Sequence, residues 1–154
     1  MNTDVRIPRV DQSAIKVSQA TMIGLLLVAF VVDVWPLVLV VAILNLLGVL
    51  SPKLDLYRQL YFRVLGPLGW VKSNVLPDHP EPHRFAKGVG AALAAVASLF
   101  LGLGLATVGW VLVWVLILLA GLNLFVGFCL GCFVYYQFSR LGVPGFEHGP
   151  LDVE

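Results

Sequence analysis

Cys129 and Cys132 are the only cysteines of the chain and form a C-x-x-C pair in the run G-F-C-L-G-C-F. A pair at this spacing can exchange dithiol for disulfide with a thioredoxin-like partner, or hand a persulfide sulfur from one cysteine to the other. The same two side chains can also bind a metal ion, or simply pack as small apolar residues. Residue type and spacing alone leave these three roles open.

His79 and His83 are the other candidate metal ligands, because two cysteines and two histidines make a zinc-binding set. They lie in L-P-D-H-P-E-P-H-R-F, on the same side of the membrane as the cysteines in the topology described below. Their spacing matches no familiar zinc pattern, and prolines flank both of them. Metal binding is therefore an alternative to thiol chemistry.

The composition sets the environment of the pair. The chain has 154 residues, of which 59% are hydrophobic and 12% charged, whereas soluble domains average about half apolar and about a quarter charged. Two apolar blocks, residues 20–50 and 88–138, are each too long for one spanning helix of about 20 residues and suit two. The sequence therefore predicts an all-α integral membrane protein built from two helical hairpins.

The breaks in the two blocks place the helices. Pro36 fits the first turn of a helix, since proline has no N–H to donate, and polar Thr107 interrupts the second block. We expect a single four-helix transmembrane domain over residues 1–154. The predicted spans, all approximate, are 18–33, 36–50, 86–105 and 110–137.

Basic residues set the orientation. All ten Lys and Arg residues fall on the side that carries both termini and the central loop of this topology, and none falls on the opposite turns. The positive-inside rule makes that side cytoplasmic. We expect a multi-pass inner (plasma) membrane protein without a cleavable signal peptide, with both termini inside and with no nucleic-acid partner.

In this topology the cysteine pair lies inside the last helix, near its cytoplasmic end. Positions three apart on a helix hold their Cβ atoms about 5–6 Å apart, and a disulfide requires about 3.5–4.5 Å. The negative pole of the helix would disfavour a thiolate there. A reactive thiolate would then need a nearby cation, for which Arg84, Lys87 or a protonated histidine is available.

Two segments connect the second and third predicted helices. Residues 52–65 place apolar and polar side chains on opposite faces, which predicts an amphipathic helix lying on the inner leaflet. Residues 76–85 hold three prolines in six residues, which predicts an extended, semi-rigid strap leading into the third helix.

Two further patterns bear on helix packing. L-N-L recurs around Asn45 and Asn123, which suggests a parallel repeat of the two hairpins. Small residues also recur at every fourth position of the third helix and allow another helix to approach closely, within the bundle or in a homodimer. These small residues are Gly90, Ala94, Ser98, Gly102 and Ala106.

Several landmarks together resemble a bacterial membrane family of unknown function, the domain-of-unknown-function family 4395. They are V-D-Q at 10–12, R-F-A at 84–86 and F-C-L-G-C at 128–132. The resemblance implies a four-helix inner-membrane protein associated with thioredoxin-like or rhodanese-like proteins. It implies no activity, and it marks only Cys129 and Cys132 as candidate functional residues.

The favoured hypothesis is thus a membrane thiol-redox or sulfur-handling protein that works through a cytoplasm-facing Cys129–Cys132 pair. The alternative is a non-enzymatic membrane scaffold or small transporter, in which the two cysteines pack or bind a metal. The sequence names no cofactor for either.

Overall fold

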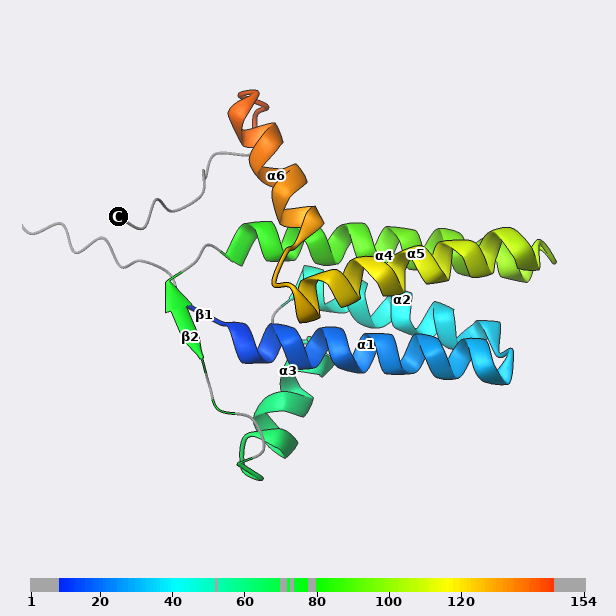
Figure 1. Cartoon of the computed structure of the whole chain (residues 1–154), viewed down its shortest axis with the longest axis horizontal. Helices are drawn as coiled ribbons and strands as arrows, with labels where there is room; N and C mark the ends of the chain where they lie inside the picture. Colours follow the sequence, from blue (N-terminus) through cyan, green and yellow to red (C-terminus); the bar gives the residue numbers. More distant parts are fainter. Residues whose placement is uncertain (1–8, 52, 70–71, 73, 78–79, 146–154) are drawn as a thin grey trace, which may run out of the picture.

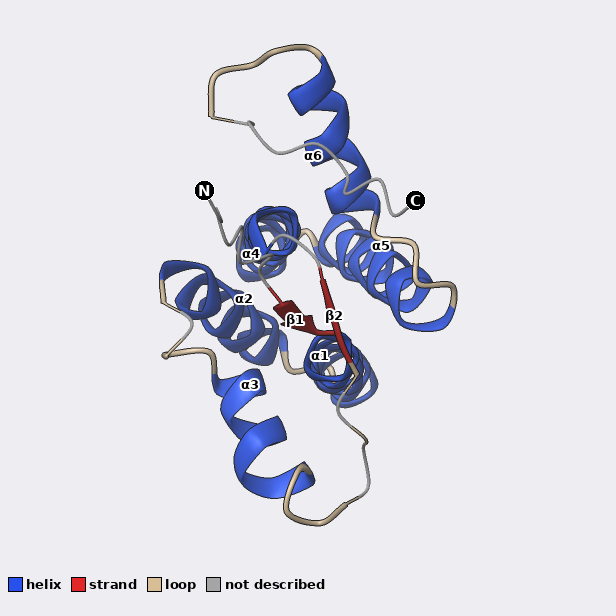
Figure 2. Ribbon diagram, turned by 90° about the vertical axis from the view of Figure 1, so that its left-hand side faces the viewer, coloured by secondary structure: helices blue, strands red, loops and turns tan. Residues whose placement is uncertain are grey.

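The computed structural model describes residues 9–51, 53–69, 72, 74–77 and 80–145. Figure 1 shows its long helices running side by side. Seen end-on in Figure 2, they form a ring in which α1 and α4 each contact both α2 and α5. Fully buried side chains from several helices, including Leu26, Val38 and Val113, fill the ring. The long helices are α1 (Gln12–Val32), α2 (Trp35–Leu50), α4 (Pro80–Gly102) and α5 (Ala106–Phe125).

Three of these helices, α1, α4 and α5, are long and apolar enough to cross a membrane. The fourth, α2, is apolar but has only 16 residues. At 1.5 Å per residue it is about 24 Å long, somewhat less than the hydrocarbon core of a typical bilayer. The all-helical membrane protein expected from the composition is therefore confirmed, while the fourth span remains a prediction.

The helix boundaries follow local chemistry. α1 begins six residues earlier than expected because the Asp11 carboxylate caps it, accepting a hydrogen bond from the Ser13 N–H at 3.0 Å. The turn into α2 passes through Asp33, which adopts the left-handed conformation (φ 55°), and Pro36 lies in the first turn of α2, as expected. Gly104, with φ 82°, takes the chain from α4 to α5.

The central connection differs from the prediction in two ways. The expected amphipathic helix 52–65 begins later, because Asp55 caps it. It consists of α3 (Leu56–Leu60) and a π-helical turn, Tyr61–Leu65. The expected strap 76–85 is mostly helical, because α4 already begins at Pro80. Prolines in a first helical turn break no hydrogen bond, so they do not delay the helix.

A two-stranded ladder, which we did not predict, precedes the bundle. β1 (Arg9–Asp11) pairs antiparallel with β2 (Val75–Pro77), so that Val10 lies opposite Leu76. The Ser13 hydroxyl adds a hydrogen bond to the Lys72 carbonyl at 2.7 Å. These contacts tie the start of α1 to the central connection, at the end of the bundle where α3 lies (Figure 1).

The small residues of α4 pack inside the chain. Ala94 and Ser98 are buried, and a Cβ added at Gly102 would meet the Trp35 ring at 3.7 Å. The middle of the close-packing face that we considered for a homodimer is thus covered by neighbouring helices of the same chain, whereas Gly102 is exposed and Ala106 begins α5 instead of continuing α4. Small side chains here let α4 approach its neighbours.

Each half of the chain consists of a helical hairpin followed by a short helix that turns away from it. The first half ends in α3 and the second in α6 (Leu130–Arg140). Figure 2 shows α3 and α6 on opposite sides of the ring. This order of elements is the one that a parallel repeat of two hairpins would produce.

Candidate functional site

The last predicted helix is two helices. α5 ends at Phe125 and α6 begins at Leu130, so the expected single helix 110–137 is wrong. The chain breaks at Gly127, whose φ of 75° is left-handed and strained for any residue with a side chain. Figure 1 shows α6 turning away from the bundle axis at this point. The C-x-x-C pair therefore lies at a helix start rather than inside a helix.

Cys129 caps the N-terminus of α6. Its Sγ accepts a hydrogen bond from the Cys132 N–H at 3.3 Å, as a serine or aspartate would at this position. The positive pole of the helix dipole faces this sulfur. Our expectation that the dipole disfavours a thiolate is therefore wrong: placed at the start of α6 instead of the end of a long helix, Cys129 experiences the opposite pole.

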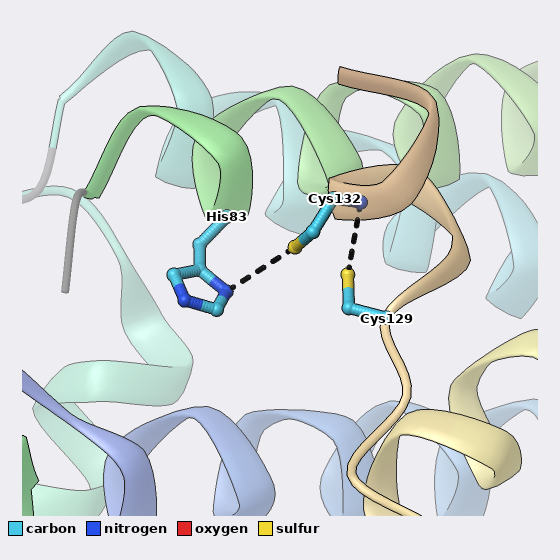
Figure 3. A group of neighbouring side chains, drawn as sticks. All are labelled: His83, Cys129 and Cys132. Atoms are coloured by element: carbon cyan, nitrogen blue, oxygen red, sulfur yellow. Dashed lines mark hydrogen bonds between the residues drawn. The ribbon is translucent and has the colours of Figure 1, made fainter. Parts of the chain in front are cut away.

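His83 completes a three-residue cluster (Figure 3). Its Nδ1 lies 3.6 Å from the Cys132 Sγ, and the ligand atoms of His83, Cys129 and Cys132 all lie within 4.8 Å of one another. His79, the other histidine that we named, falls outside the described residues. The structure thus unites one of the two candidate histidines with both cysteines.

The basic side chain that contacts the pair is His83 rather than either of the other two that we considered. Lys87 forms an ion pair with Asp55, and Arg84 donates a hydrogen bond from Nη2 to the Val49 carbonyl at 2.7 Å. Both of these interactions lie at the end of α2. Among the cations named from the sequence, His83 is therefore the one that contacts the cysteine pair.

The environment lowers the pKa of the Cys129 thiol from 9.0 to about 6. The largest cause is a hydrogen bond from the Cys132 side chain, which stabilises the thiolate. Backbone hydrogen bonds from Cys132 and Gly131 and the charge of His83 act in the same direction, while partial burial opposes them. Cys129 is thus largely ionised at neutral pH and partly exposed, whereas Cys132 is buried.

Close packing of α6 on α4 positions the cluster. A Cβ built on Gly131 would lie 2.6 Å from the Cβ and 2.8 Å from the Cα of Ala86. Further along α6, the Tyr135 hydroxyl donates to the Glu81 carboxylate at 3.2 Å, and the rings of Tyr135 and Phe85 lie 5.8 Å apart. Gly131 is thus the point where the two helices meet.

We predict that Gly131→Ala displaces α6 from α4 and separates His83 from the cysteines. Overpacking of this kind costs about 1–3 kcal/mol, and the rate of maleimide labelling of Cys129 at pH 7 should fall as the cluster opens. Gly121→Ala is the matched control, because a Cβ at Gly121 meets no atom within 4 Å among the described residues. Equal labelling rates in the two variants would contradict the prediction.

The arrangement has two chemical uses. An ionised, accessible Cys129 is a nucleophile, a buried Cys132 is placed to attack it in turn, and His83 can take the proton of Cys132. Alternatively, two sulfurs and one imidazole nitrogen form three ligands of a site for a soft or borderline metal ion. Reasoning from the sequence missed the role of His83 toward Cys132, because the two are 49 residues apart.

The comparisons with known proteins add a family but no activity. The sequence pattern of the family described as Domain of unknown function (DUF4395) matches residues 10–140, which include α1 to α6 and the whole cysteine site. Neither the curated proteins nor the solved structures gave a significant match.

Proposed function

Because the chain belongs to the DUF4395 family, whose description carries no activity, we propose its function from the site: it is a membrane thiol protein. Its Cys129–Cys132 pair exchanges disulfide or transfers sulfur with a thioredoxin-like or rhodanese-like partner. The observation that carries this proposal is the position of Cys129 at the N-cap of α6, where its sulfur accepts the Cys132 N–H. A thiolate in this position is both stabilised and accessible.

Disulfide exchange would proceed in two displacements. The Cys129 thiolate attacks one sulfur of the partner's disulfide, an S–S bond forms between the proteins, and the partner's other sulfur leaves as a thiolate. Cys132 then passes its proton to His83 and attacks the Cys129 Sγ, which releases the partner's second thiolate. The partner gains two electrons, and the pair becomes a disulfide; the reverse sequence reduces the pair.

Sulfur transfer would use the same nucleophile. The Cys129 thiolate attacks the outer sulfur of a partner's persulfide, and the partner's cysteine leaves as a thiolate. Attack by Cys132 on the inner sulfur of the new persulfide then releases hydrosulfide and closes the disulfide, whereas attack on the outer sulfur passes the persulfide to Cys132. Both routes require the two sulfurs to lie close, as they do here.

The proposal includes a location. Four spanning helices would place the start of α1, the end of α2, the start of α4 and the end of α5 on one side of the membrane. All ten basic residues belong to that side, which the positive-inside rule makes cytoplasmic. The cysteine pair would then meet its partner at the cytoplasmic face of the inner membrane, where thiols are kept reduced.

A redox titration of the purified chain tests the function. Free thiols are blocked with a mass-adding maleimide and counted at each potential. We expect Cys129 and Cys132 to disappear together, as a two-electron couple, within the cytosolic range of about −220 to −320 mV. If both cysteines remain reduced under a strong oxidant, dithiol exchange is excluded.

Metal binding is the second candidate function, and the cluster of His83, Cys129 and Cys132 favours it. Zinc or a monovalent copper ion would take the two thiolates and the imidazole and leave a position for a further ligand. The metal content of the sample used for the redox titration distinguishes the two. A stoichiometric ion that is lost on His83→Ala, with thiols protected from oxidant, would support a metal site.

A further inference from the structure

A cavity of about 360 Å³ adjoins the cysteine pair. Side chains of α1, α2, α4 and α5 line it, and Cys129 and Gly131 form part of its wall where α6 begins. The volume lies within the usual range for small-molecule sites. It is too small for a dinucleotide, so the ligand that fits it is of modest size.

Apolar side chains and carboxamides make up much of the lining, beside the charged side chains of Arg9, Asp11, Asp55, Arg58, Arg84 and Lys87. Of these, Lys87 and Asp55 pair with each other. Met22, Leu93, Leu116 and Leu119 contribute apolar walls. Among them lie three carboxamides, Gln19, Asn45 and Asn123. The apolar and carboxamide part of the lining suits an uncharged ring with a small number of polar atoms.

Carboxamides have a property that matters for a redox ligand. Each offers both N–H donors and a carbonyl acceptor, so it can bind a carbonyl group and equally the hydroxyl group formed when that carbonyl is reduced. The Gln19 Oε1 is buried and has no hydrogen-bond partner among the described residues. The Asn45 Nδ2, by contrast, is held by the Val41 carbonyl at 3.0 Å. The Gln19 oxygen lies beneath the cavity wall, and a turn of its side chain would let it accept a hydrogen bond from a donor in the cavity, such as the hydroxyl group formed when a carbonyl is reduced.

The cysteine pair needs a second redox partner in order to turn over. The chain has two cysteines, which store one pair of electrons. A pair that exchanges electrons with a protein partner turns over only if something else removes or supplies them. Cys129 lines the cavity, so a redox ligand bound there would reach the sulfur directly.

We propose that this cavity binds a lipid-soluble quinone, which exchanges two electrons and two protons with the Cys129–Cys132 pair. The proposal rests on the proposed thiol function and names its second redox partner. Dinucleotide cofactors of flavin or nicotinamide are larger than a cavity of about 360 Å³ accommodates. A quinone ring is uncharged, dissolves in the bilayer around the helices, and presents the two carbonyls that the amides can bind.

The step balances as follows. The Cys129 thiolate attacks an electrophilic carbon of the quinone and forms a C–S bond. Cys132 gives its proton to His83 and attacks the Cys129 Sγ; the S–S bond forms, the C–S bond breaks, and its electron pair remains on the ring. The ring takes up two protons, one of them through His83, which also lines the cavity, and becomes a hydroquinone. The pair loses two electrons, and the quinone gains them.

Filling the cavity tests the proposal. Leu119→Trp places an indole in the cavity, whereas Leu118→Trp, one residue earlier on α5, faces outward from a side chain that is 65% exposed. Reduced protein in lipid nanodiscs is mixed with ubiquinone-1 without oxygen, and free thiols are counted over time. We expect wild type and Leu118→Trp to lose both thiols together and Leu119→Trp to do so at least about tenfold more slowly.

Diamide, a small soluble thiol oxidant, separates the possible failures. It should oxidise all three proteins alike, which shows that Leu119→Trp leaves the pair intact. Oxidation of Leu119→Trp by ubiquinone-1 as fast as Leu118→Trp would overturn the proposal. If diamide oxidises the wild-type thiols and ubiquinone-1 does not, the quinone proposal is overturned and the thiol-exchange function is retained. Resistance to both overturns the thiol function and the quinone proposal together.

Binding can be measured without the chemistry. In the Cys129→Ser/Cys132→Ser double variant, equilibrium dialysis should find one saturable ubiquinone-1 per chain above the amount taken up by empty nanodiscs. Adding Leu119→Trp should remove that saturable part, and adding Leu118→Trp should not. Uptake equal to that of empty nanodiscs in the double variant would overturn the cavity assignment.

Discussion

Replacing Cys129 with serine is expected to abolish the fast-reacting thiol of this chain, whereas replacing Cys132 with serine preserves it. With a pKa of about 6, Cys129 is roughly nine tenths ionised at pH 7, against roughly one hundredth for a thiol of ordinary pKa. The thiol that remains in Cys129→Ser is Cys132, which is buried. Rates of alkylation by iodoacetamide at pH 7 should therefore differ by at least about tenfold between the two variants.

The alkylation rate of Cys129 should depend on pH through the ionisation of its thiol. Since the thiolate is the reactive form and its pKa is lowered, the alkylation rate of Cys132→Ser should be at its plateau at pH 8 and fall as the pH drops through about 6. Serine can replace the side-chain hydrogen bond that Cys132 donates. Cys132→Ala cannot, so its midpoint should move upward, toward the ordinary value. A midpoint near 9 in Cys132→Ser would contradict the assignment of Cys129 as the nucleophile.

The same pair of variants has a functional consequence. Without Cys132 to resolve it, a mixed disulfide between Cys129 and a partner persists, so Cys132→Ser should accumulate a covalent adduct with a thioredoxin-like protein. Cys129→Ser should accumulate none. If Cys129→Ser forms the adduct and Cys132→Ser does not, Cys132 is the attacking cysteine and Cys129 the resolving one.

The sequence predicted the bundle but not the break that creates the site. Block lengths and Pro36 located the four long helices because lipid requires long apolar helices and helix-breaking residues mark their ends. Thr107, which we expected in the gap between the third and fourth helices, lies in the first turn of α5. Residues 110–137, however, hold no proline and no charged residue, and their polar residues Asn123 and Gln137 lie outside the break. The signal present was Gly127, a residue type that commonly ends a helix in the left-handed conformation, and glycine is too frequent in membrane helices for that signal to decide.

Long-range geometry accounts for the other difference. Which histidine meets the cysteines depends on where α4 begins, and Pro82 and Pro80 suggested an extended segment there rather than a first helical turn. Because α4 starts at Pro80, His83 lies on a helix packed against α6. Asp11 was visible before α1, but its capping role depends on a backbone conformation that composition does not reveal.

The second large effect is expected at the ion pair that joins the two halves of the chain. Lys87 of α4 binds Asp55, the residue that caps α3, and the two side chains are only 18% and 12% exposed. A Cβ at Gly48 would lie 3.0 Å from the Lys87 Nζ, so α2 closes over the pair. The Lys87 ammonium also lies 5.6 Å from the centre of the Tyr57 ring, and burial raises the pKa of Tyr57 to about 12.

Lys87→Met should therefore lower the free energy of unfolding by about 3 kcal/mol, because it leaves the Asp55 carboxylate enclosed and unpaired. Lys16→Met, at an exposed lysine of α1, is the matched control and should change stability by less than about 0.5 kcal/mol. The double variant Lys87→Met/Asp55→Asn removes both charges and keeps a capping side chain on α3, so most of the lost stability should return. Unfolding in mixed micelles with increasing sodium dodecyl sulfate, followed by circular dichroism, measures all three variants against wild type.

A loss of stability in Lys87→Met no larger than in Lys16→Met would show that the ion pair does not hold α3 to the bundle. A double variant as unstable as the single one would show that the lysine acts through its packing against Tyr57 instead of its charge.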